Sequence, residues 1–310
     1  MLSVLNAIAL LLIAVSPSFE WLVVASFING MTAVVPQLLV PFAAQLAAPE
    51  QRGRVVGTVM GGLLAGIVAG RLVSGFAGEF LGWRSIFWIA AIGMLALAAV
   101  LSKTLPIVMP SVKLSYGALM RSLPGFLKTY PLLRETALMG ALFFLTYCGF
   151  WATLPFLLAQ PPFELGSQVV GLFGLVGIVG VFAAPVVGRI ADRSSPRTTV
   201  VAAMGILVLA LLMLWQFQQA IGGILLGSIL LDLGVQTGQI SNQTRIYTLP
   251  AEAHNRITTV YMVSYFLGGS IGSWLCAIGW KLAGWTGVCA IGLGAVVISF
   301  VVYRTQSQAS

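Results

Sequence analysis

The sequence predicts an all-α membrane protein with many membrane-spanning helices, and both its composition and its apolar pattern support this fold class. Hydrophobic residues make up 59% of the 310 residues and charged residues only 8%. A soluble protein carries roughly 25% charged residues, because polar groups must cover much of its surface. The unbroken apolar run at 202–215 also differs from the alternating pattern of a transmembrane β-barrel strand. Soluble enzymes, disordered regions and nucleic-acid-binding domains are therefore excluded as classes, and the lipid bilayer is the expected partner.

Ten apolar segments approach the length of about 20 residues that a membrane-spanning helix needs. They group into a first bundle at 1–104 and a second bundle at 134–310, joined by a cytoplasmic linker at 105–133. The linker alternates Pro, basic and apolar residues, which indicates a segment lying on the membrane surface. The predicted spans lie at about 1–15, 20–46, 55–77, 84–104, 135–158, 168–188, 198–215, 220–243, 257–280 and 285–303.

Charged and aromatic residues predict the orientation of these spans. If residue 1 starts in the cytoplasm, 13 of the 16 Lys and Arg residues lie in cytoplasmic segments. This bias predicts that both termini are cytoplasmic and that the chain lies in a cell membrane, with a bacterial inner membrane as the expected location. Six tryptophans fall near the predicted outer ends, as in an interfacial belt. They are Trp21, Trp83, Trp88, Trp215, Trp280 and Trp285.

The chain resembles itself at an offset of 202 residues. Such self-similarity indicates a parallel repeat of two helical bundles. The second half has two early spans, from residue 135, whose counterparts would fall before Met1, so we expect the first half to lack an opening pair of about 70 residues. The matching pairs are Gln37 and Gln239, Arg54 and Arg256, Met60 and Met262, Gly66 and Gly268, Gly70 and Gly272, Gly82 and Gly284, and Trp83 and Trp285.

A polar stripe in the span at 220–243 is the first candidate for a binding site. Asp232 lies deep in this span, and Gln236, Gln239 and Gln243 follow it at helical spacing on the same face. An ionisable group is costly in hydrocarbon, so Asp232 is a candidate for binding a proton or a substrate. The alternative is that these side chains hydrogen-bond neighbouring helices and only hold the bundle together.

Four further residues are weaker candidates for the same role. Arg71 could hold an anionic group, pair with a carboxylate between helices, or extend to the outer surface. Tyr147 and Trp151 recur with Phe143 at every fourth position and could stack against a flat or amphipathic substrate. Ordinary helix packing also produces such a stripe. Gln37 joins the group as the counterpart of Gln239 in the repeat.

No residue combination typical of an enzyme or a metal site is visible in the sequence. Cys148, Cys276 and Cys289 lie in apolar runs without a paired His spacing. There is no Ser-His-Asp set and no Walker motif. We therefore expect neither enzyme activity nor a cofactor or metal.

Three motifs carry a resemblance to a known family. The loop at 188–197 reads Gly-Arg-Ile-Ala-Asp-Arg-Ser-Ser-Pro-Arg, and the span from residue 55 contains a spaced series of small residues, with Arg71 inside it. The third motif combines the loop at 49–54 with the tripeptide at 82–84. Together these motifs resemble the major facilitator superfamily, close to its drug:proton antiporter branch. The loop is similar to the signature G-x-L-A-D-R-x-G-R-R, and the small residues are similar to the antiporter signature of the fifth family span.

The resemblance implies roles for two sets of residues. The first would be a conformational latch on the cytoplasmic side and consists of Gly188, Asp192, Arg193 and Arg197. The second would allow close helix packing and consists of Gly57, Gly66, Gly70, Ser74 and Gly75. Ser26 stands where the antiporters carry an arginine, so coupling through that arginine is not carried over.

The resemblance also implies a fold and a function. The fold would be a major facilitator-type pair of helical bundles, truncated here to about ten transmembrane helices. The function would be secondary active transport of a small organic solute by alternating access, coupled to protons and directed outward. The alternative is a truncated, non-transporting remnant that inserts into the membrane.

Overall fold

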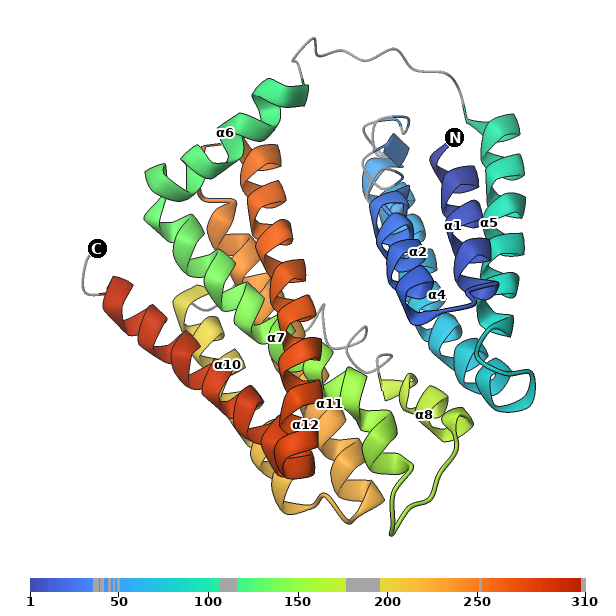
Figure 1. Cartoon of the computed structure of the whole chain (residues 1–310). Helices are drawn as coiled ribbons and strands as arrows, with labels where there is room; N and C mark the ends of the chain where they lie inside the picture. Colours follow the sequence, from blue (N-terminus) through green and yellow to red (C-terminus); the bar gives the residue numbers. More distant parts are fainter. Residues whose placement is uncertain are drawn as a thin grey trace. The chain divides into compact units, whose positions relative to one another are not determined.

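The computed structural model of the chain describes residues 1–35, 39, 42–43, 46, 48, 51–105, 116–176, 196–250 and 253–307. The regular elements of this part are helices (Figure 1). They belong to two units, of which unit 1 comprises Met1–Ser111 with Gly166–Leu175, and unit 2 comprises Val112–Leu165 with Val176–Ser310.

Unit 1 is built around α1 (Leu2–Ala14), which packs against both α2 (Phe19–Thr32) and α5 (Ser85–Thr104). The long helix α4 (Arg52–Phe80) packs mainly against the short helix α8 (Ser167–Phe173). Only 6% of the apolar stretch of α4, and likewise of α5, is buried, whereas half of the corresponding stretch of a unit 2 helix such as α11 is buried. Few residues of α4 and α5 are therefore fully buried.

A polar contact ties α1 to α2 inside this apolar unit. The Nδ2 group of Asn6 donates hydrogen bonds to Asn29 Oδ1 and to Thr32 Oγ1, each over 3.0 Å. Asn6 is 5% exposed. Hydrogen bonds of this kind between helices in a membrane contribute about 1 kcal/mol each. Asn6 is therefore a specific link between the first two helices.

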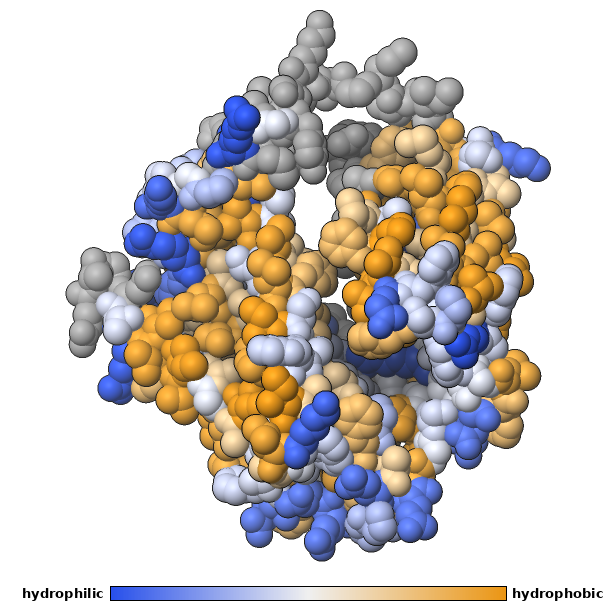
Figure 2. Space-filling view, viewed as in Figure 1, coloured by the Kyte–Doolittle hydropathy of each residue, from blue (hydrophilic) through white to orange (hydrophobic). Residues whose placement is uncertain are grey.

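Unit 2 is organised around α7, whose largest contact is with α12 and which also packs against α11. The α10 helix packs against α11 and α12. In Figure 2, hydrophobic side chains cover much of the visible flank of this unit, and hydrophilic side chains gather at its lower end. Its helices are α6 (Tyr116–Thr129), α7 (Pro131–Leu158), α10 (Pro196–Gln216), α11 (Ile221–Ile246) and α12 (His254–Ser307).

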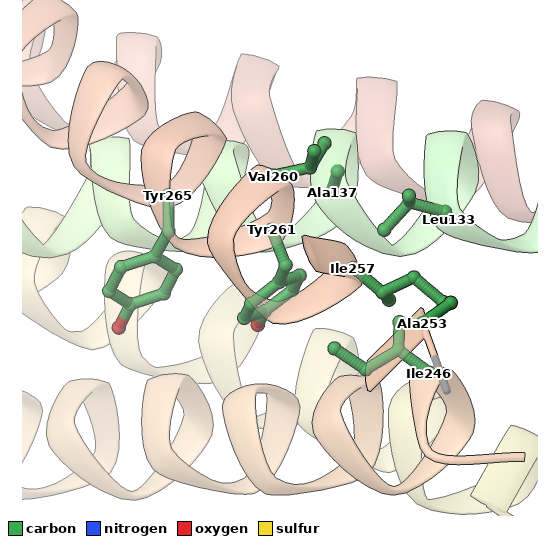
Figure 3. Packing of buried hydrophobic residues seen from close by; sticks show 8 residues of the cluster. All are labelled: Leu133, Ala137, Ile246, Ala253, Ile257, Val260, Tyr261 and Tyr265. Carbon is green, nitrogen blue, oxygen red and sulfur yellow. The ribbon is translucent and has the colours of Figure 1, made fainter. Parts of the chain in front are cut away.

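Glycines allow α12 to approach the backbone of α7 closely. A Cβ atom added to Gly268 would lie 2.6 Å from Ala141 Cα, and one added to Gly272 would lie 2.6 Å from Leu145 Cα. These distances are far below van der Waals contact, so only glycine fits at both positions. The contact continues into the apolar cluster of Figure 3, formed by Leu133, Ala137, Ile246, Ala253, Ile257, Val260, Tyr261 and Tyr265.

The predicted linker contains a helix that packs onto unit 2. On α6, Leu123, Phe126 and Leu127 lie against the apolar cluster, and the guanidinium group of Arg256 lies 5.4 Å from the centre of the Phe126 ring. This replaces the expectation that the whole linker lies on the membrane surface, because the apolar face of α6 is covered by protein. Residues 106–115 of the linker lie outside the described part.

The described helices lie where the apolar runs predict them, but fewer of them than the ten predicted spans are long enough to cross a membrane. Six helices of the described part are long and apolar enough to cross a membrane. The longest, α12, covers two predicted spans. Its backbone is non-helical at Ala283 and Gly284, where the first of these spans ends and the second begins. The α1 helix has 13 residues and is short for a span. Residues 166–175, predicted in the second bundle, group with unit 1.

The internal repeat has a counterpart in the backbone. Gly82, which follows α4, has φ +82°, and Gly284, inside α12, has φ +57°. Both glycines therefore occupy a left-handed conformation that other residues rarely adopt.

The tryptophans that follow these two glycines lie in different environments. Trp83 is 45% exposed, whereas Trp285 is 3% exposed and donates from Nε1 to Leu214 O over 2.9 Å. The prediction that Trp285 belongs to an interfacial belt is therefore wrong, because its ring packs inside unit 2.

Candidate solute and proton site

The acidic residue of the predicted stripe lies inside unit 2. Asp232 lies in the middle of α11 and is 5% exposed. A carboxylate in this position changes its charge only if its surroundings can accommodate both forms. The geometry therefore makes Asp232 a candidate proton-binding group.

The three glutamines that follow Asp232 are less buried than the carboxylate. Gln236, Gln239 and Gln243 are each half-buried on α11. The hydroxyl group of Tyr265 donates a hydrogen bond to Gln239 Oε1 over 3.3 Å. One member of the stripe thus binds a neighbouring helix, as the structural alternative predicted. Gln236 and Gln243 leave amide groups partly accessible for hydrogen bonding.

Aromatic side chains of α7 and α12 form a continuous series next to these glutamines. The rings of Phe144 and Tyr265 stack with their centres 4.0 Å apart, and Phe144 also stacks with Tyr147 at 5.6 Å. Trp151 follows with its edge toward Tyr147 at 6.1 Å. Tyr147 and Trp151 are half-buried, as a surface that contacts a solute would require.

Phe143 does not belong to this series, although the sequence spacing placed it there. Its side chain is 1% exposed and packs against Gly238 of α11. The helix turns by about 100° per residue, so Phe144 and Phe143 face different neighbours. Phe144 therefore takes the place in the stack that spacing alone assigned to Phe143.

The predicted small-residue series approaches another helix at one end only. A Cβ atom added to Gly75 would lie 2.7 Å from Gly171 Cα of α8. No described atom lies within 4 Å of a Cβ added to Gly57, Gly66 or Gly70. The prediction that Gly66 and Gly70 pack closely is therefore not met within the described residues. Ser74 is exposed.

Arg71 lies one turn from this contact. Its Cδ atom would be 3.0 Å from a Cβ added to Gly174, so the side chain lies along the end of α8. It is half-buried. A cavity of about 950 Å³ in unit 1 lies elsewhere, and its lining is mostly apolar. It includes Leu2, Leu95 and Leu101.

Several predicted residues fall outside the described part of the chain. These are Gln37 and, in the predicted latch loop, Gly188, Asp192 and Arg193. Arg197 is described and lies exposed in the first turn of α10. The latch itself remains a prediction. Among the described residues, no group of three His, Cys, Asp or Glu side chains could hold a metal ion.

The sequence analysis did not single out one buried ion pair. Arg245 Nη2 of α11 donates to Glu135 Oε1 of α7 over 2.7 Å. Both residues stand at the ends of predicted spans, where charges normally face water, so they looked like ordinary flanking residues. Their opposite charges at the same predicted membrane side were the available signal.

Comparison with known proteins defines the family of this chain. A family model described as Major Facilitator Superfamily matches residues 1–273. The chain belongs to this superfamily. An uncharacterised transporter, YgaY, of Escherichia coli O157:H7 is 38% identical over 302 residues, which are 97% of this chain and 77% of that protein. The probable transporter SCO4007 of Streptomyces coelicolor is 30% identical over 268 residues, which are 85% of this chain and 61% of that protein.

Solved structures of the superfamily share the fold. The nucleoside transporter NupG matches with a TM-score of 0.76 and 14% identity, over 98% of this chain and 81% of that one. A bacterial homologue of the human lysosomal transporter Spinster, in an inward-facing and occupied conformation, matches with a TM-score of 0.72 and 13% identity, over 99% and 81%. This superfamily member is therefore a multi-pass membrane transporter and not an enzyme, and its bacterial relatives indicate a cell membrane.

Proposed function

We propose that this transporter moves a small organic solute by alternating access and couples that movement to protons. Outward transport, as in the drug:proton antiporter branch, is the direction we propose from the sequence motifs. The observation that carries proton coupling is the burial of Asp232 in the middle of α11. A cavity that opened alternately to each side would change the hydration of this carboxylate and hence its affinity for a proton.

The surroundings of Asp232 support a solute of a particular kind. Tyr147 and Trp151 offer half-buried aromatic faces, and Gln236 and Gln243 offer half-buried amides. Aromatic faces stack on flat apolar groups, and amides both donate and accept hydrogen bonds. This combination favours an amphipathic solute with a planar ring and a few polar groups.

The test compares the full-length protein with its Asp232→Asn variant in proteoliposomes. Asparagine keeps the size and polarity of the side chain but cannot titrate. A panel of small aromatic solutes is screened for accumulation driven by an imposed pH gradient, and then for exchange without a gradient. We expect Asp232→Asn to lose accumulation and to retain exchange.

A matched control removes a carboxylate elsewhere. Glu164 is exposed in the loop between α7 and α8, so Glu164→Gln should accumulate solute like the native protein. Accumulation by Asp232→Asn with unchanged pH dependence would show that Asp232 is a structural residue.

A further inference from the structure

The ion pair between Glu135 and Arg245 lies in an unusual place for two charges. Glu135 is in the second turn of α7 and Arg245 in the last turn of α11, and their side chains are 7% and 6% exposed. Burying an ion pair is costly, and replacement by well-packed apolar residues is often neutral or stabilising. A buried pair in a membrane bundle therefore indicates a role beyond stability.

The guanidinium group of Arg245 uses only part of its hydrogen-bonding capacity. Its Nη2 group binds Glu135, but its Nη1 group is buried and has no partner among the described residues. Arginine stays protonated in proteins, so this donor cannot be removed by a change of charge. A second set of acceptors is therefore expected nearby.

Candidate acceptors lie on α11 and α12. Asn242 precedes it by one turn on the same helix, and long helical side chains lean toward the residue three positions earlier. Asn242 is 0% exposed, and neither atom of its amide has a partner in the described part of the chain. The hydroxyl group of Tyr261 on α12 lies beside Asn242 without a well-aligned hydrogen bond, and it is equally unpartnered there.

Tyr261 is held in this position by the backbone of α7. A Cβ atom added to Gly140 would lie 2.8 Å from the Tyr261 hydroxyl oxygen and 2.9 Å from its ring. The same tyrosine belongs to the apolar cluster of Figure 3, together with Leu133 and Ala137 of α7 and Ile246 of α11. The three unpartnered groups therefore lie where α7, α11 and α12 meet, inside an apolar shell.

The other charged groups of these helices do not pair with Glu135. In the described part of the chain, the ion pair of Glu135 is with Arg245. His254 Nε2 hydrogen-bonds Leu249 O over 2.7 Å, and Arg256 lies over the Phe126 ring. On α12, Tyr265 donates to Gln239. Arg121 and Lys128 of α6 and Arg134 of α7 are exposed, and Asp232 lies about three and a half turns before Arg245 on α11.

We propose that Glu135 is a second proton-binding site of the transporter and that Arg245 is a two-position switch. With Glu135 ionised, Arg245 binds its carboxylate, as in this structure. When a proton from the aqueous phase adds to a carboxylate oxygen of Glu135, the side chain changes from a charge of about −1 to neutral, and Arg245 keeps its own charge. Arg245 then turns to the carbonyl oxygen of Asn242 and the hydroxyl oxygen of Tyr261. The exchange releases the charged link between α7 and α11.

This inference rests on the proposed function for its ligand, the proton, but its first test does not require transport. Glu135→Gln imitates the protonated side chain, and Asn242→Leu removes one acceptor at similar volume. The thermal midpoint of the detergent-purified full chain is measured for each variant and for the double variant. We expect Glu135→Gln to fold, and Asn242→Leu to lower the midpoint by at least about 5 °C more in the Glu135→Gln background than in the native one.

The physical reason is that the Asn242 amide has no hydrogen-bond partner among the described residues while Glu135 is ionised, and that the proposal requires this amide as an acceptor only after protonation. Asn6→Leu is the matched control, because Asn6 binds α2 in unit 1 and should lower the midpoint equally in both backgrounds. An equal cost of Asn242→Leu in both backgrounds would overturn the proposal. Failure of Glu135→Gln to fold would also overturn it, since Arg245 would then have no second position.

A transport measurement separates this proposal from the proposed function. In proteoliposomes, Glu135→Gln should retain solute exchange and lose part of the pH dependence of accumulation. Unchanged pH dependence in this variant, with loss of accumulation in Asp232→Asn, would reject the Glu135 site alone. Absence of proton-driven accumulation in the native protein would reject the proposed function, whereas the thermal measurements would still decide whether Arg245 has two positions.

Discussion

The crossing of α4 and α8 predicts that one glycine of the small-residue series is indispensable and that a neighbouring one is not. A Cβ atom at Gly75 would lie 2.7 Å from Gly171 Cα, 2.8 Å from Ser167 O and 3.0 Å from Gly171 N. All three are backbone atoms, so no side-chain rotation can relieve the contact. Gly75→Ala must therefore push the two helices apart.

The expected cost follows from two opposing effects. Overpacking of this kind costs about 1–3 kcal/mol. Replacing a helical glycine by alanine contributes up to about 1 kcal/mol in the opposite direction. Gly70→Ala on the same helix has the second effect without the first, because no described atom lies within 4 Å of its added Cβ. The two variants should thus differ by about 1–3 kcal/mol in the free energy of unfolding.

The assay is thermal unfolding of the two purified variants in the same detergent. We expect Gly75→Ala to melt several degrees below Gly70→Ala, since about 1 kcal/mol corresponds to about 2–4 °C in a domain of this size. Membrane insertion of both should equal that of the native chain. Equal midpoints for the two variants, or a lower midpoint for Gly70→Ala, would refute the assignment of the close contact to Gly75.

Two further predictions concern contacts that distinguish similar residues. Trp285→Phe removes the hydrogen bond to Leu214 O and leaves a void. In thermal unfolding, this variant should therefore destabilise unit 2 by about 2 kcal/mol. Trp83→Phe, at the exposed counterpart, should have little effect. Arg256→Met removes the cation–π contact with Phe126, which is worth about 0.5–1 kcal/mol. The rate of limited proteolysis within α6 should therefore rise. Arg304→Met, at the end of α12, should leave that rate unchanged.

The sequence was sufficient to predict the fold class, because apolar runs and the distribution of basic residues are properties of single segments. The pairing of Gly82 with Gly284 in the repeat also agrees with the structure, because both glycines have a left-handed backbone conformation. It was insufficient for contacts, since these depend on which helix is the neighbour. Gly268 and Gly272 lie directly against α7, whereas no such neighbour is described for their counterparts Gly66 and Gly70.

Spacing within one helix could not decide between Phe143 and Phe144, because neighbouring positions face different helices. The pair of Glu135 and Arg245 was missed for a similar reason, since the two residues are 110 positions apart. Pairing across that separation follows from the packing of α7 on α11.

Coupling of solute movement to protons through Asp232 can be measured by following the two movements together. Proteoliposomes that enclose a pH-sensitive dye are exposed to a gradient of a solute identified in the screen. We expect solute flow through the native protein to drive proton flow in the opposite direction, and Asp232→Asn to move solute without any change of internal pH. Proton flow of equal size through Asp232→Asn, or solute flow without proton flow through the native protein, would show that Asp232 does not couple the two movements.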